Sequence, residues 1–160
     1  MLIHGAFADG SSWDKVIPFL QAKGFKVVAV QNPLTSLADD ASAAQRAIDA
    51  QTGSVILVGH SWGGTVITQA GTSDKAKALV YVAAFAPSEG QTSGELGKDL
   101  PPGPGLENLK PDANGFMALT QESLTKNFAQ DVSPAMTKIM FATQGPVVAK
   151  AFGEAVPVAS

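Results

Sequence analysis

The chain has 160 residues, enough for one domain with a sizeable core, and its 11 Lys and Arg against 14 Asp and Glu give a formal net charge of −3. The slight negative charge argues against a nucleic-acid-binding protein, because phosphate contacts need a surplus of Lys and Arg, and the 45% hydrophobic content argues against disorder. The absence of cysteine excludes disulfides, a cysteine nucleophile and thiolate metal sites, and two histidines are too few for a His-rich zinc site.

Neither a signal peptide nor a membrane helix is predicted. The N-terminus has no basic segment followed by a long apolar run. The longest apolar run, residues 78–87, is far shorter than the roughly 20 residues that a membrane helix needs. We therefore expect a soluble, cytoplasmic protein with no membrane or nucleic-acid partner and with no metal.

Three short runs rich in β-branched residues predict buried strands. They lie at residues 26–31, 54–58 and 78–84, and each is apolar almost without interruption rather than alternating. This pattern is typical of strands buried on both faces of a parallel sheet. Leu2 and Ile3 are predicted to end a fourth strand.

Helical patterns lie between these runs. Residues 11–23 predict a helix that Pro18 would kink and Gly24 would end. Residues 36–50 predict a cleaner helix, with Ser36 as its N-cap and with acidic residues in its first turn. A third helix is predicted at 61–70. Strands that alternate with helices in this order predict right-handed βαβ units and an α/β fold with a parallel sheet of about four strands.

The composition changes after Pro87, where Gly, Pro, Asn and Asp become frequent. Residues 88–115 are predicted to form a long loop, and helices without strands are expected after it. Ser133 and Pro134 predict a helix start, with Met136, Ile139 and Met140 facing inward, and Gly145-Pro146 is expected to begin another helix. We therefore divide the chain into a core, residues 1–87, and a loop and helical cap region, residues 88–160, over the strand ends.

A candidate catalytic motif lies at residues 59–63. The sequence Gly-His-Ser-Trp-Gly matches G-x-S-x-G, with a predicted strand directly before it and a predicted helix directly after it. This setting is the one required by a nucleophile elbow, a sharp turn that lifts a serine hydroxyl above the sheet edge at a helix N-terminus. An independent motif, Ile-His-Gly-Ala-Phe at residues 3–7, ends an earlier strand, where the second oxyanion donor of such a site would lie.

Taken together, these segments resemble the α/β-hydrolase family, and most closely its small esterase and hydroxynitrile-lyase-like branch. The resemblance rests on residues 4–13, 27–34, 58–64 and 79–87. It implies a cofactor-free serine esterase acting on a small ester. The roles that it implies are a nucleophile, Ser61; oxyanion donors, the N–H groups of Ala6 and Trp62; an apolar pocket, Phe7 and Phe85; and a positioning residue, His4.

The acid and the histidine of the family's triad have no counterpart after Ser61. The two histidines are His4 and His60, and the later carboxylates follow no further predicted strand. The resemblance therefore implies the central section of a larger hydrolase, with further strands before His4 and beyond Ser160. His60 is expected to point away from the serine, and His4 as a makeshift base stays open. A catalytically inactive remnant or binding module, and a hydroxynitrile lyase, are the alternative functions.

Three further features complete the sequence-based expectations. Residues 59–65 lack the Lys of a phosphate-binding loop and do not form a dinucleotide-binding turn. Asp39 and Asp40 are better explained as charges at a helix N-terminus than as a metal or acid pair. The strand at 78–84 is predicted to form an open sheet edge without charge or proline, through which a homodimer could assemble.

Overall fold

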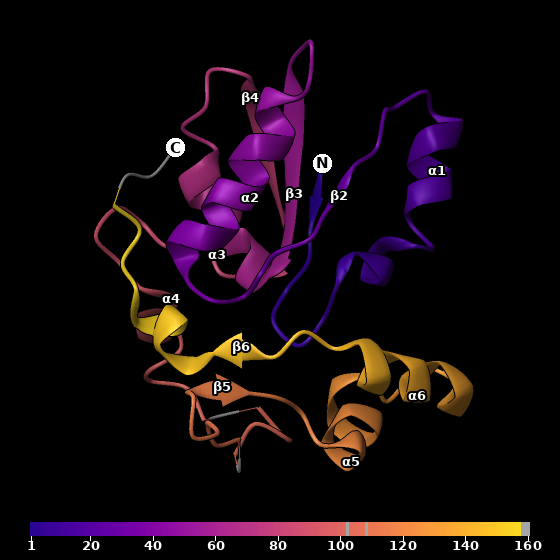
Figure 1. Cartoon of the computed structure of the whole chain (residues 1–160), viewed down its shortest axis with the longest axis vertical. Coiled ribbons are helices and arrows are strands. Elements are labelled where there is room, and N and C mark those ends of the chain that lie inside the picture. Colours follow the sequence, from indigo (N-terminus) through magenta and orange to yellow (C-terminus); the bar gives the residue numbers. More distant parts are fainter. Residues whose placement is uncertain (102, 108, 158–160) are drawn as a thin grey trace.

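The computed structural model describes residues 1–101, 103–107 and 109–157. Its centre is a parallel sheet of four strands in the order β2-β1-β3-β4 (Figure 1). The strands are β1 (Leu2–Ile3), β2 (Ala29–Val30), β3 (Val55–Ser61) and β4 (Ala76–Ala84). The predicted α/β architecture is therefore confirmed. The strand expected at 26–31 is shorter than predicted, because its partner β1 offers only two residues for pairing.

Two helices, α2 (Leu37–Asp49) and α3 (Trp62–Ala70), lie side by side against the sheet (Figure 1). The α2 helix begins as predicted, because the Ser36 side chain accepts a hydrogen bond from the Asp39 N–H at 3.0 Å. At its other end the Lys75 ammonium donates to the carbonyls of Asp49 and Gln51 at 3.0 and 2.6 Å. A cation at this position suits the negative end of the helix dipole.

The helix predicted at 11–23 is wrong in its extent. The structure has a 3₁₀ turn, η1 (Gly10–Trp13), and a short helix, α1 (Ile17–Ala22). Pro18 lies in the first turn of α1 rather than in the middle of a longer helix, because a proline lacks the N–H that an interior position would donate.

The second region lies beyond the carboxyl ends of the parallel strands (Figure 1). Its helical elements are α4 (Ser93–Leu96), α5 (Gln121–Ser123), the π-helix η2 (Leu124–Phe128), α6 (Pro134–Thr143) and the 3₁₀ helix η3 (Ala149–Gly153). The expectation of helices without strands is wrong. Two short strands, β5 (Phe116–Met117) and β6 (Val147–Val148), form an antiparallel pair.

The β6 strand also corrects the helix expected from Gly145-Pro146. Val147 and Val148 are both buried, and the Val148 N–H donates to the Leu34 carbonyl of the core region at 2.9 Å. Burial of two β-branched side chains and a backbone hydrogen bond to a neighbouring segment favour extended structure here. The contact also joins the second region to the loop that follows β2.

The α6 helix begins as predicted, at Ser133 and Pro134, but the face expected to be buried is correct only for Met140, which is half-buried and packs against the core. Met136 and Ile139 are exposed, whereas Thr137 is the buried residue of this helix. The face of α6 that packs inward thus includes Thr137 and Met140, and it leaves the other two predicted residues exposed.

The β4 strand lies at the edge of the sheet, as predicted. Among the described residues it pairs with β3 alone, so its second edge has no neighbouring strand. Val80 and Val82 are 44% and 41% exposed. Within the described part of the chain, no helix is long and apolar enough to cross a membrane.

Candidate active site

Ser61 lies where β3 ends and α3 begins, in a backbone conformation that L-residues rarely adopt. Its φ and ψ are 51° and −120°, and its side chain is half-buried. Conformations of this kind cost about 1–3 kcal/mol and persist only where the surrounding structure enforces them. The predicted strand–turn–helix setting of the motif is therefore present, with a strained serine at its apex.

Glycines permit the tight packing around this turn. A Cβ atom on Gly63 would overlap the carbonyl oxygen of Ile3, and a Cβ atom on Gly64 would overlap that of Phe85. The ends of β1 and β4 can thus approach the start of α3 only because no side chain lies between them. The Phe85 N–H also donates to the Ser61 carbonyl at 3.2 Å, which ties the end of β4 to the turn.

The second motif lies directly against the serine. A Cβ atom on Gly5 would lie 2.9 Å from the Ser61 Cβ, so the loop after β1 passes within contact distance of the elbow. Ala6 is buried next along this loop, and Phe7 has a positive φ of 60°. Trp62 is the first residue of α3, and the first N–H groups of a helix have no partner within it. The structure therefore brings together the two segments that were predicted to supply oxyanion donors.

The His4 side chain is buried, and both of its ring nitrogens are engaged. Nδ1 lies 2.8 Å from the Gly5 carbonyl oxygen, and Nε2 accepts the backbone N–H of Asn32 at 3.0 Å. This pattern corresponds to the neutral tautomer with its proton on Nδ1. Burial lowers the pKa of His4. The ring is thus tied to the backbone on both sides, which favours the positioning role over that of a base.

His60 precedes the serine and is half-buried, and burial lowers its pKa. Its Nδ1 would lie 3.3 Å from a Cβ atom on Gly5, so the ring contacts the loop after β1. Among the hydrogen bonds of the described residues, none joins Ser61 to an imidazole or to a carboxylate. The site therefore holds a serine and candidate oxyanion donors, but no paired base in residues 1–101, 103–107 and 109–157.

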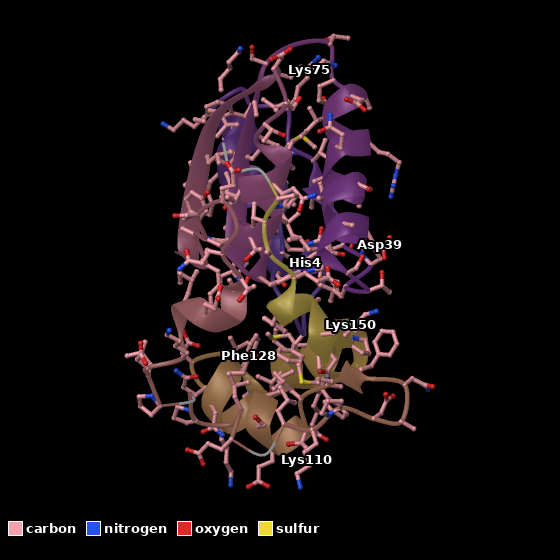
Figure 2. All side chains as sticks on the ribbon, turned by 90° about the vertical axis from the view of Figure 1, so that its left-hand side faces the viewer. His4, Asp39, Lys75, Lys110, Phe128 and Lys150 are labelled. Carbon is pink, nitrogen blue, oxygen red and sulfur yellow. The ribbon has the colours of Figure 1, made fainter. Side chains whose placement is uncertain are left out.

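Aromatic side chains connect the elbow with the second region. Phe7 packs edge-to-face on Phe128, with ring centroids 6.3 Å apart. Phe152 contacts both Phe85 and Trp62, at 6.4 and 5.0 Å between centroids. Figure 2 shows Phe128 beyond the end of the sheet at which His4 lies. Two aromatic residues of the region after Pro87 thus pack on Phe7 and Phe85, the two residues predicted to line a pocket.

Asp40 is part of this site, although no pattern in the sequence separates it from Asp39. It is fully buried; its Oδ1 accepts the Leu34 N–H and its Oδ2 accepts the indole N–H of Trp62, both at 2.7 Å. Burial raises the pKa of Asp40 to about 6, although both hydrogen bonds lower it. Asp39 is exposed and accepts the Thr35 hydroxyl. The explanation as helix N-terminal charge is therefore incomplete for Asp40.

Comparisons with known proteins bear on the family and the fold of this chain. The profile of the Alpha/beta hydrolase family matches residues 1–158. The "Probable hydrolase R7" of Phoma sp. is 32% identical in an alignment of 111 residues, with coverages of 59% of this chain and 46% of that protein, so the chain spans about half the length of this curated relative.

Several solved structures share the fold. A pyrethroid hydrolase from Sphingobium faniae is 23% identical, with a TM-score of 0.77 over 99% of this chain and 71% of that one. An extracellular alpha/beta-hydrolase from a Paenibacillus species is 25% identical, with a TM-score of 0.72 over 99% and 68%. A methylesterase from Arabidopsis is 21% identical, with a TM-score of 0.74 over 99% and 70%.

Proposed function

The chain belongs to the alpha/beta hydrolase family, and we propose that within this family it is a serine hydrolase that acts on small esters through Ser61. The observation that carries this proposal is the strained backbone of Ser61, with the loop of Gly5 and Ala6 packed against it. Strain of this kind is concentrated at functional sites, where it presents a side chain that a relaxed turn would not present. No cofactor takes part in the proposed reaction.

The proposed chemistry is acyl transfer. The Ser61 oxygen forms a bond to the carbonyl carbon of the ester, and the electron pair of the C=O π bond moves onto the carbonyl oxygen. The N–H groups of Ala6 and Trp62 bind that oxyanion, and the serine proton passes to water. Collapse of the intermediate expels the alcohol, which takes up a proton, and water then releases the acid from Ser61. Each oxyanion donor in such a site contributes roughly 10²–10³-fold to the rate.

The aromatic side chains favour an apolar acyl or alcohol group. Phe7 and Phe85 lie on the sheet side, and Phe128 and Phe152 contact them from the second region. Apolar surroundings of this kind next to the serine would suit an uncharged group better than a charged one, because a charge buried without a partner is costly. One structural neighbour is a methylesterase, which supports an ester as the substrate class.

The positions and hydrogen bonds of the two histidines lead us to expect slow turnover. His4 has both ring nitrogens bonded to backbone, and no histidine follows Ser61. A serine without a base is a weak nucleophile near neutral pH, and loss of a triad member leaves ~10³–10⁴-fold catalysis over water. A second candidate function is an ester-binding module that does not turn its ligand over, and the engagement of both His4 ring nitrogens with backbone is the observation that favours it.

Hydrolysis of p-nitrophenyl acetate, together with labelling by a fluorophosphonate probe, tests the proposal. We expect hydrolysis well below the ~1–10³ per second of ordinary enzymes, and we expect Ser61→Ala to abolish both the hydrolysis and the labelling. His4→Ala and His60→Ala then show whether either ring supplies a base. Labelling that persists in Ser61→Ala would contradict the role of Ser61, and tight ester binding without labelling would support the binding module.

A further inference from the structure

Asp40 connects three segments that are distant in the sequence. It lies in the first turn of α2, and it accepts the N–H of Leu34 from the loop after β2 and the indole N–H of Trp62 from α3. Leu34 has a positive φ of 60°, so the loop turns sharply at the point where the carboxylate holds it. One buried side chain thus ties both the loop and the elbow to α2.

Trp62 links this carboxylate to the serine that precedes it in the chain. Its side chain is fully buried, held at the indole N–H by Asp40 and packed against Phe152 with ring centroids 5.0 Å apart. A tryptophan side chain has two rotatable bonds, so restraint of the ring at its N–H and on its face also restrains the Trp62 backbone. The backbone N–H of Trp62 belongs to the peptide group that directly follows Ser61.

We propose that Asp40 is a positioning residue of the elbow, which fixes the peptide between Ser61 and Trp62 by holding the indole of Trp62. The inference rests on the proposed function, because that function gives the Trp62 N–H its role as an oxyanion donor. Oxyanion donors act only when they are already aimed at the developing charge, and a misplacement of 1 Å can cost roughly 100-fold in rate.

A carboxylate suits this position better than an amide does. Both of its oxygens accept, one from Leu34 and one from Trp62, whereas an amide has one acceptor and would turn an NH₂ group toward the other donor. The charged groups near Asp40 are Asp39 on its own helix and Glu154 after η3, whose carboxylate accepts the Leu37 N–H at 2.7 Å. Both are negative, so Asp40 has no cationic partner among its described neighbours, and its two N–H donors stabilise the charge.

The test measures the rate at which a fluorophosphonate labels Ser61 in the wild type, Asp40→Asn, Trp62→Phe and the double variant. Asp39→Asn is the matched control, because Asp39 lies one residue away in the same helical turn and is exposed. We expect Asp40→Asn and Trp62→Phe each to slow labelling by about 10–100-fold. We expect the double variant to be no slower than the slower single variant, and the control to stay within about twofold of the wild type.

A second measurement follows the fluorescence of Trp62 as the pH changes. In Trp13→Phe protein, Trp62 is the only tryptophan. Its fluorescence should change with a midpoint near pH 6, where Asp40 gains a proton and one oxygen stops accepting, and the labelling rate should change with it. Adding Asp40→Asn should remove this transition.

The outcomes separate this inference from the proposed function. Wild-type labelling rates in folded Asp40→Asn, additive effects in the double variant, or fluorescence that is flat from pH 4 to 8 would each overturn the positioning role. An unlabelled wild type would overturn the proposed function instead. In that case, a fluorescence transition that is lost in Asp40→Asn would still support the anchoring of Trp62 by Asp40. The absence of any transition would overturn that anchoring.

Discussion

Replacing Ser61 by glycine should stabilise the protein while it removes the proposed nucleophile. With φ at 51° and ψ at −120°, any residue with a Cβ atom is strained here, at a cost of about 1–3 kcal/mol. Glycine avoids this cost but loses about 0.5–1 kcal/mol more backbone entropy on folding than alanine does. Ser61→Ala keeps the Cβ atom and therefore the strain. We expect Ser61→Gly to be more stable than Ser61→Ala by about 1 kcal/mol.

The same two substitutions at Ser42 provide the control. Ser42 is exposed within α2, where alanine should be more stable than glycine by about 1 kcal/mol. The order of the two variants should thus reverse between the positions. Urea denaturation followed by tryptophan fluorescence resolves such differences, because an m-value of about 1–3 kcal/mol/M turns 1 kcal/mol into a midpoint shift of roughly 0.3–1 M. If the alanine variant is more stable than the glycine variant at both positions, the backbone at Ser61 is relaxed in solution.

Three further predictions follow from the packing, the charge and the open strand edge. Gly63→Ala should destabilise the protein by about 1–3 kcal/mol, since its Cβ atom would meet backbone carbonyls of β1, whereas Gly53→Ala, which has open space around it, should be neutral in the same denaturation assay. Burial raises the pKa of the Asp40 carboxyl above its value in the unfolded chain, so folding favours the protonated form. The stability gained from this protonation is complete below pH 4 and is lost as the pH rises through about 6. The wild type should therefore gain stability relative to Asp40→Asn, by at most about 3 kcal/mol, as the pH falls from 7 to 4, and a constant difference in urea titrations would contradict the raised pKa. We further propose that the free edge of β4 pairs with a second copy, so the wild type should dimerise at tens of micromolar by light scattering and Val82→Lys should be monomeric; a monomeric wild type would refute edge pairing.

The elbow could be predicted from the sequence because its signals are local. An apolar run, a serine between glycines and a following helical pattern lie within about 20 residues, and each acts through the conformations allowed to its own backbone. The N-caps at Ser36 and Ser133 were predicted for the same reason, since a cap bonds an N–H only a few residues away. The order of strands and helices then indicated a parallel sheet, because few connections satisfy that order.

Features that depend on distant partners could not be predicted in this way. The length of β2 depends on the two residues that β1 offers it, and the buried face of α6 depends on which elements lie against that helix. Val147 and Val148 form a strand because Phe116 and Met117, some 30 residues earlier, are available for pairing.

Asp39 and Asp40 show the difference most clearly. As neighbours in one helical turn they have the same local role, and both suit the N-terminus of a helix. Burial separates them, because Asp39 faces solvent while Asp40 faces an indole that lies 22 residues away in the sequence. Hydrogen bonding and desolvation depend on what surrounds a group in space. The sequence specifies a carboxylate at this turn, but only the packing of α2 on α3 buries it and brings the indole of Trp62 to it.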